Sequence, residues 1–64
     1  MPYIEVTLAT GRSPEQLRAL ISGLTAAAVE SLGTSIEAVR VVLHEVPRTH
    51  FAAGDVTLAE RDAR

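Results

Sequence analysis

The sequence predicts an α/β fold: a single βαβ unit with a short C-terminal hairpin, assembled into an oligomer. Two strand-like apolar segments, residues 3–8 and 39–46, flank a single amphipathic helical segment. A strand, a helix and a second strand of these lengths are typical of two parallel strands joined by a right-handed crossover. The chain has 64 residues, which is enough for one domain, and we expect that domain to span residues 1–64.

The first strand and the helix are predicted from periodicity. Residues 3–8 alternate, with Ile4, Val6 and Leu8 on one face. Ser13 is a candidate helix N-cap, and Gln16, three residues later, completes a capping box. Pro14 suits the first helical position, and Gly33 the left-handed position that ends helices. Between them, apolar residues recur at helical spacing: Leu17, Leu20, Ile21, Leu24, Ala28 and Leu32.

The second strand, residues 39–46, has apolar side chains at both parities, which is typical of a strand covered on both faces. Residues 35–38 are expected to form a connecting turn before it. After Pro47, residues 53–56 predict a hairpin turn with Gly54 at its first central position. The polar residues 60–64 are expected to be a tail that frays.

The small size of the chain predicts association. A monomer of 6.8 kDa buries little apolar surface, and the sequence contains no cysteine that could form a disulfide. We interpret His44 and His50 as structural, so no zinc site is expected. Two parallel strands and one helix also leave both sheet edges and one sheet face open. We therefore expect an obligate oligomer.

Composition argues against several classes of function. The net charge is −2 and there is no basic run, which argues against nucleic acid as the main partner. No apolar stretch approaches the ~20 residues that span a bilayer. No signal peptide pattern is visible either. We therefore expect a cytoplasmic protein without a membrane partner.

Pro2 is the first candidate for chemistry. If Met1 is removed, Pro2 becomes a free secondary amine fixed at the start of a strand, and α-amino groups titrate near ~7.7–8.0. An apolar pocket and nearby arginine cations would lower the pKa of this amine and favour its neutral, basic form. The plain alternative is that proline is tolerated as the first residue of a strand.

Two arginines and one aromatic residue add to this hypothesis. Arg40 interrupts the most apolar strand, where a buried charge needs a partner, and its planar fork suits a carboxylate. A salt bridge to Glu5 or Glu45 would explain it equally well. Arg12 lies in the turn before the helix, where an ordinary solvated arginine is the alternative. Phe51, the only phenylalanine, is either a pocket wall or a plug in a subunit interface.

Four features together resemble the 4-oxalocrotonate tautomerase (2-hydroxymuconate tautomerase) family of the tautomerase superfamily. They are Pro2 behind the initiator methionine, residues 11–16 (GRSPEQ), residues 39–43 (VRVVL) and His50-Phe51. The resemblance covers nearly the whole chain, from Pro2 to about Val56. It implies βαβ subunits that pair into dimers, with three dimers forming a homohexamer, and a pocket that collects groups from more than one subunit.

The resemblance also implies an activity: a cofactor-independent keto–enol tautomerase, an isomerase in the breakdown of aromatic compounds. Its substrate would be a small dicarboxylate or 2-keto acid, such as the 2-hydroxydienoate 2-hydroxymuconate, and neither metal nor organic cofactor is implied. Pro2 would be the general acid/base and Arg40 would stabilise the carbonyl oxygen. Arg12 would hold a carboxylate, and Phe51 would line the pocket.

Alternatives remain open at the sequence level. The same site could serve a hydratase, a dehalogenase or a decarboxylase of unsaturated acids. Ala53 stands where related dehalogenases and hydratases place a glutamate, which weakens the dehalogenase alternative. Ala9 stands where a larger apolar residue often borders the pocket, which suggests a roomier site. If Met1 is retained, a non-catalytic assembly subunit becomes the better interpretation.

Overall fold

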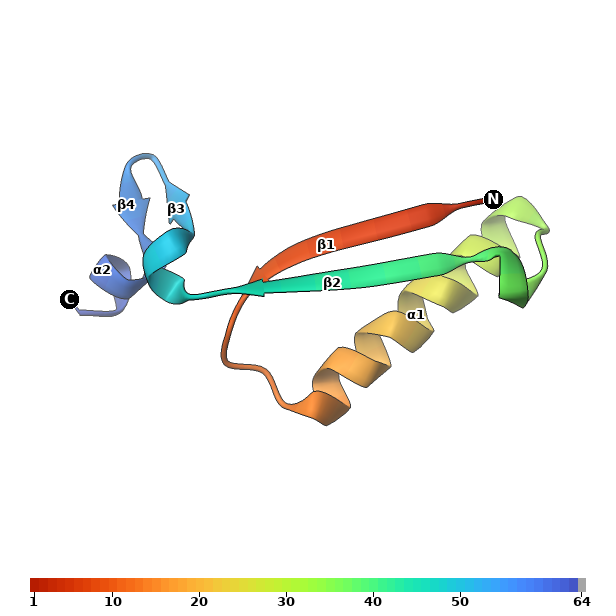
Figure 1. The fold of residues 1–64 in the computed structure, drawn as a ribbon, viewed down its shortest axis with the longest axis horizontal. Helices are drawn as coiled ribbons and strands as arrows, with labels where there is room; N and C mark the ends of the chain where they lie inside the picture. The colour runs from red at the N-terminus through yellow and green to blue at the C-terminus, as the bar shows by residue number, and fades with distance from the viewer. Residues whose placement is uncertain (64) are drawn as a thin grey trace.

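The computed structural model describes residues 1–63 and shows one long helix beside two parallel strands (Figure 1). In chain order the elements are β1 (Tyr3–Ala9), α1 (Pro14–Leu32), η1 (Ile36–Ala38), β2 (Arg40–Val46), η2 (Arg48–His50), β3 (Ala52–Ala53), β4 (Val56–Thr57) and α2 (Leu58–Asp62), where η marks a 3-10 helix. Strands β1 and β2 pair in parallel, with Tyr3 opposite Arg40 and Ala9 opposite Val46. The predicted βαβ unit is confirmed.

The two ends of α1 are set by local signals. The Ser13 hydroxyl accepts a hydrogen bond from the Gln16 N–H at 3.1 Å, and the Gln16 side chain accepts one from the Ser13 N–H at 2.9 Å. At the other end, Gly33 has a left-handed φ of 65° and its N–H donates to the Val29 carbonyl at 3.0 Å. Both predicted helix ends are confirmed, and they fix the loops that flank the helix.

A single chain has almost no buried core. Along β1, side chains alternate between half-buried and exposed, and the half-buried ones are those of the predicted apolar face. Among residues 1–63 only Ala9, 6% exposed, is buried. Leu32 was predicted to lie on the apolar face of the helix, yet it is 65% exposed, and Tyr3 on the other sheet face is 60% exposed. One chain therefore covers one face of its sheet, and the expected cover on the second face is absent within it.

The shape of the chain agrees with this burial pattern. Its radius of gyration is 14.8 Å, whereas a compact domain of this length has roughly 11 Å. Its accessible surface is 4613 Å², compared with roughly 4,000 Å² for a compact protein of this mass. The excess surface includes exposed apolar side chains, which is typical of a surface that another chain covers.

The C-terminal segment lies beyond the end of β2 (Figure 1). Gly54 and Asp55 have φ of 60° and 65°, so a two-residue type I′ turn joins β3 and β4, which confirms the predicted hairpin. The expectation of a fraying tail was wrong for residues 60–62, which belong to α2. This helix forms because Thr57 and Glu60 make a second capping box. Arg48 secures it with two hydrogen bonds to the carboxylate of Asp62.

We expect acidification to release α2 from η2. The hydrogen bonds from Arg48 lower the pKa of Asp62, and those from the backbone N–H and hydroxyl of Thr57 lower the pKa of Glu60. A carboxyl with a lowered folded-state pKa stabilises the fold above its unfolded pKa, and that contribution is lost as pH falls through the folded value. Helical NMR shifts of residues 58–62 should therefore diminish below about pH 4.

The matched variants test the same ion pair at neutral pH. Asp62→Asn should reproduce the loss of helical shifts at pH 7, because the bidentate partner of Arg48 is gone. Asp55→Asn removes an equal charge at a turn position that asparagine tolerates, and it should leave α2 intact. Unchanged α2 shifts in Asp62→Asn would show that the ion pair does not hold this helix.

Candidate functional site

Pro2 and Arg40 meet through their main chains at the amino ends of the two strands. The Pro2 carbonyl accepts a hydrogen bond from the Arg40 N–H at 3.0 Å. Pro2 is half-buried, and Met1 before it is 87% exposed. The start of β1 is thus anchored to the start of β2, so the backbone that carries the Pro2 nitrogen has a defined position.

The guanidinium of Arg40 is held by its own chain. Its Nη1 donates to the Glu37 carbonyl at 2.5 Å. The alternative salt bridge to Glu5 is not formed; Glu5 Oε2 instead lies 2.6 Å from Nε2 of His44 on the neighbouring strand. A salt bridge to Glu45 is not formed either. Within residues 1–63 the Arg40 guanidinium therefore has no carboxylate partner, and its remaining N–H groups can bind an anionic ligand.

Arg12 and Phe51 lie at the other end of the sheet. Arg12 is exposed in the loop after β1, directly before the Ser13 cap of α1. Phe51 is half-buried after β2, and its carbonyl accepts the Leu58 N–H at 2.9 Å. Figure 1 shows the N-terminus and the loop between β1 and α1 at opposite ends of β1. At about 3.3 Å per residue, that strand separates Pro2 from Arg12 by roughly 20 Å.

One chain therefore brings together two of the four predicted residues and leaves the other two apart from them. The pair at the amino ends is Pro2 with Arg40, and the pair at the carboxyl ends is Arg12 with Phe51. An arginine side chain is too short to cross the length of β1. A site that contains all four residues has to draw on more than one chain.

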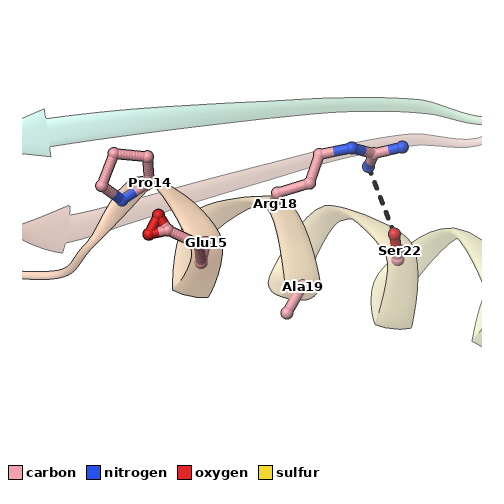
Figure 2. Close-up of a pocket in the computed structure, with 5 residues that line it drawn as sticks. All are labelled: Pro14, Glu15, Arg18, Ala19 and Ser22. Carbon is pink, nitrogen blue, oxygen red and sulfur yellow. Dashed lines mark hydrogen bonds between the residues drawn. The ribbon is translucent and has the colours of Figure 1, made fainter.

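A hollow of about 480 Å³ lies over the first half of α1, but it contains none of these four residues. Figure 2 shows its lining of Pro14, Glu15, Arg18, Ala19 and Ser22. Arg18 extends along the helix and its Nη1 donates to the Ser22 hydroxyl at 3.2 Å. All of the lining comes from the start of a single helix, so the hollow is an open depression and not the predicted site.

Residues 1–63 contain no group of three histidine, cysteine, aspartate or glutamate side chains placed to hold a metal ion. Over the same residues, no helix combines the length and the apolar character needed to cross a membrane.

The acceptor that holds the Arg40 guanidinium was not predicted from the sequence. Residues 35–38 were predicted to be a connecting turn, and they do form one, with the Ala38 N–H donating to the Ser35 carbonyl at 3.1 Å. The group that matters is a main-chain carbonyl within this turn. A pattern of side chains carries no signal for such an acceptor, so the contact could be found only in the structure.

Comparison with known proteins identifies the family. The family model for the tautomerase enzymes matches residues 2–61. The 2-hydroxymuconate tautomerase of Comamonas testosteroni is 37% identical over 60 residues, which is 94% of this chain and 95% of that protein.

Two solved structures share the fold. TomN, a 4-oxalocrotonate tautomerase homologue in the tomaymycin biosynthetic pathway, has a TM-score of 0.95 and 51% identity over 98% of this chain and 97% of its own. A heterohexameric 4-oxalocrotonate tautomerase from Chloroflexus aurantiacus J-10-fl has a TM-score of 0.90 and 37% identity. The match covers 94% of this chain and 97% of that one. With nearly the whole chain matched in sequence and fold, this protein belongs to the tautomerase enzyme family, as the resemblance to 4-oxalocrotonate tautomerases implied.

Proposed function

We propose that the protein is a cofactor-independent keto–enol tautomerase of 2-hydroxydienoates such as 2-hydroxymuconate, with Pro2 as general acid and base. The observation that carries this proposal is the placement of Pro2. It directly follows Met1, and its carbonyl is anchored to β2 by the Arg40 N–H at 3.0 Å. Removal of Met1 is required, because only then does the Pro2 nitrogen become an amine. Membership of the family and the name of the Comamonas relative support the reaction class.

The reaction moves one proton and leaves the composition of the substrate unchanged. The neutral Pro2 nitrogen accepts the proton of the 2-hydroxyl group, and the electrons of the O–H bond form the carbonyl. The double bonds shift along the chain, and the resulting ammonium returns the proton to a distant carbon. The product is the conjugated ketone, so one group acts first as base and then as acid.

The arginines stabilise the charge that this transfer creates. Negative charge builds on the oxygen at carbon 2, where a guanidinium donor stabilises the transition state more than the ground state. We assign this role to Arg40, which has no carboxylate partner within residues 1–63. Arg12 holds a substrate carboxylate by paired hydrogen bonds, and Phe51 forms an apolar wall.

The working unit is an oligomer, which we propose to be a homohexamer of three dimers. The length of β1 prevents Pro2 and Arg12 of one chain from meeting. The elongated shape and the bare sheet face support covering by other copies. The heterohexamer of the Chloroflexus relative shows that the same fold is compatible with six subunits.

Two relatives support different pathways for the same chemistry. The Comamonas enzyme is named for 2-hydroxymuconate, which fits the breakdown of aromatic compounds. TomN, 51% identical to this chain, belongs to a biosynthetic pathway, so a biosynthetic enol is the second candidate substrate. Turnover of a panel of 2-hydroxydienoates with one or two carboxylates, together with halogenated acrylates, would separate these substrates and the hydratase and dehalogenase alternatives.

Pro2→Ala should abolish most of the turnover. General acid–base catalysis by one group contributes about 10²–10⁴-fold, so we expect kcat for 2-hydroxymuconate to fall at least about a hundredfold. Pro47→Ala is the matched control, because Pro47 is exposed and its carbonyl, which accepts from the His50 N–H, is kept by alanine. Intact mass spectrometry on each protein should show loss of Met1. Full activity in Pro2→Ala, or a wild-type protein that keeps Met1, would contradict the proposal.

Mixing two inactive variants tests whether the site lies between chains. Pro2→Ala and Arg12→Ala should each be inactive alone. Refolded together in equal amounts, they should recover about one quarter of the wild-type activity, since a random symmetric assembly pairs one intact Pro2 with one intact Arg12 in that share of sites. If the mixture stays inactive while sedimentation shows mixed oligomers, Pro2 and Arg12 do not act in a shared site.

A further inference from the structure

We propose that the 3-10 helix η1 is a positioning element, whose Glu37 carbonyl holds the Arg40 guanidinium and presents its Nε–Nη2 side to the substrate. This inference rests on the proposed function of Arg40 as a ligand of the substrate's oxygen atoms. It adds the Glu37 carbonyl to the proposed site as a group that acts through Arg40. It holds whether Arg40 acts together with Pro2 of its own chain or with Pro2 of another chain.

The hydrogen-bond pattern of η1 explains why this carbonyl is available. In a 3-10 helix each carbonyl accepts from the N–H three residues later. The structure shows two such bonds, from Ala38 to Ser35 at 3.1 Å and from Val39 to Ile36 at 3.2 Å. The next bond would join the Arg40 N–H to the Glu37 carbonyl. That N–H instead donates to Pro2 at 3.0 Å, where the parallel ladder begins.

The Arg40 side chain donates to the Glu37 carbonyl in place of the Arg40 backbone N–H, which is bonded to Pro2. Nη1 donates to the Glu37 carbonyl at 2.5 Å, so this carbonyl has a donor although the turn ends before it could receive a backbone N–H. One residue therefore joins two elements: its main chain fixes the start of β1, and its side chain is fixed by η1. A change in the turn would move the guanidinium relative to the strand start.

The tether matters because Arg40 is exposed. A free surface arginine samples many rotamers, and ordering it on binding opposes affinity. Held through Nη1, the guanidinium has no hydrogen-bond partner among residues 1–63 for its Nε–H and Nη2–H groups. These lie on one side of the planar fork and can make two parallel hydrogen bonds to a carboxylate or an oxyanion. We therefore expect the turn to preorganise Arg40 before the substrate arrives.

Ala38→Pro tests the tether. Proline at this position removes the Ala38 N–H that closes the turn, and it disfavours the helical conformation of Glu37. With 2-hydroxymuconate, kcat should fall by at least about tenfold, while in an Arg40→Ala background the same change should cost less than about twofold. Ser35→Ala is the control, because the Ser35 side chain makes no capping hydrogen bond and its carbonyl is kept; it should match the wild type.

Equal losses from Ala38→Pro in both backgrounds would overturn the inference, because the turn would then act on the fold and not through Arg40. An Ala38→Pro variant with wild-type Arg40 that shows no loss of kcat would also overturn it. Elution volume and thermal melting establish that the variants assemble. If Ala38→Pro does not fold, Arg40→Lys decides: one ammonium cannot hold the carbonyl and also bind the substrate through a planar fork, so kcat should drop at least about tenfold, and unchanged kcat would refute the tether.

These outcomes separate the tether from the proposed function. If Pro2→Ala is inactive while Ala38→Pro matches the wild type, the tautomerase proposal stands and the tether alone fails. If Pro2→Ala retains full activity, the proposed function fails whatever the turn variants show.

Discussion

The structure depends on one constraint: two parallel strands and one helix cannot cover both faces of their own sheet. Parallel strands are ordinarily buried on both sides. Here α1 covers the side of Ile4, Val6 and Leu8, and the other side carries Tyr3 and the Glu5–His44 pair in the open. The radius of gyration of 14.8 Å agrees with this, because a chain with so little buried core is not compact. Stability therefore has to come from association with other chains, and the proposed chemistry can use the same association.

The strands also set the spacing of the functional groups. The groups proposed to do chemistry occur at the strand ends, where Pro2 and Arg40 precede the ladder and Arg12 and Phe51 follow it. The hydrogen bond from the Arg40 N–H to the Pro2 carbonyl begins the ladder and anchors the proposed base at once. The seven residues of β1 then separate the proposed base from Arg12. A chain with this spacing places complementary halves of a site at opposite ends, which suits symmetric assembly.

Local signals in the sequence predicted most of the fold. Ser13, Gln16 and Gly33 marked the helix ends because caps depend on neighbouring residues alone. The capping box at Thr57 and Glu60 is equally local, and α2 was missed only because a polar C-terminal segment favoured a tail. Two features could not be predicted from local signals: the exposure of Leu32 and the carbonyl that binds Arg40. Periodicity shows that a face is apolar, but it does not show which chain covers it, and side-chain patterns do not show main-chain acceptors.

The choice of basic residues fits a site built around one amine. The six residues that are lysine or arginine are all arginines, so the chain has no lysine amine that could compete with Pro2 as the proposed base. Arginine is effectively always charged in proteins, and a permanent cation beside the proposed Pro2 amine would disfavour its protonated form. The guanidinium can also make two directed contacts at once, as Arg48 does with Asp62. Arg40 needs that property if it is to keep the Glu37 carbonyl and bind a substrate oxygen, and a lysine would supply the charge without the second contact.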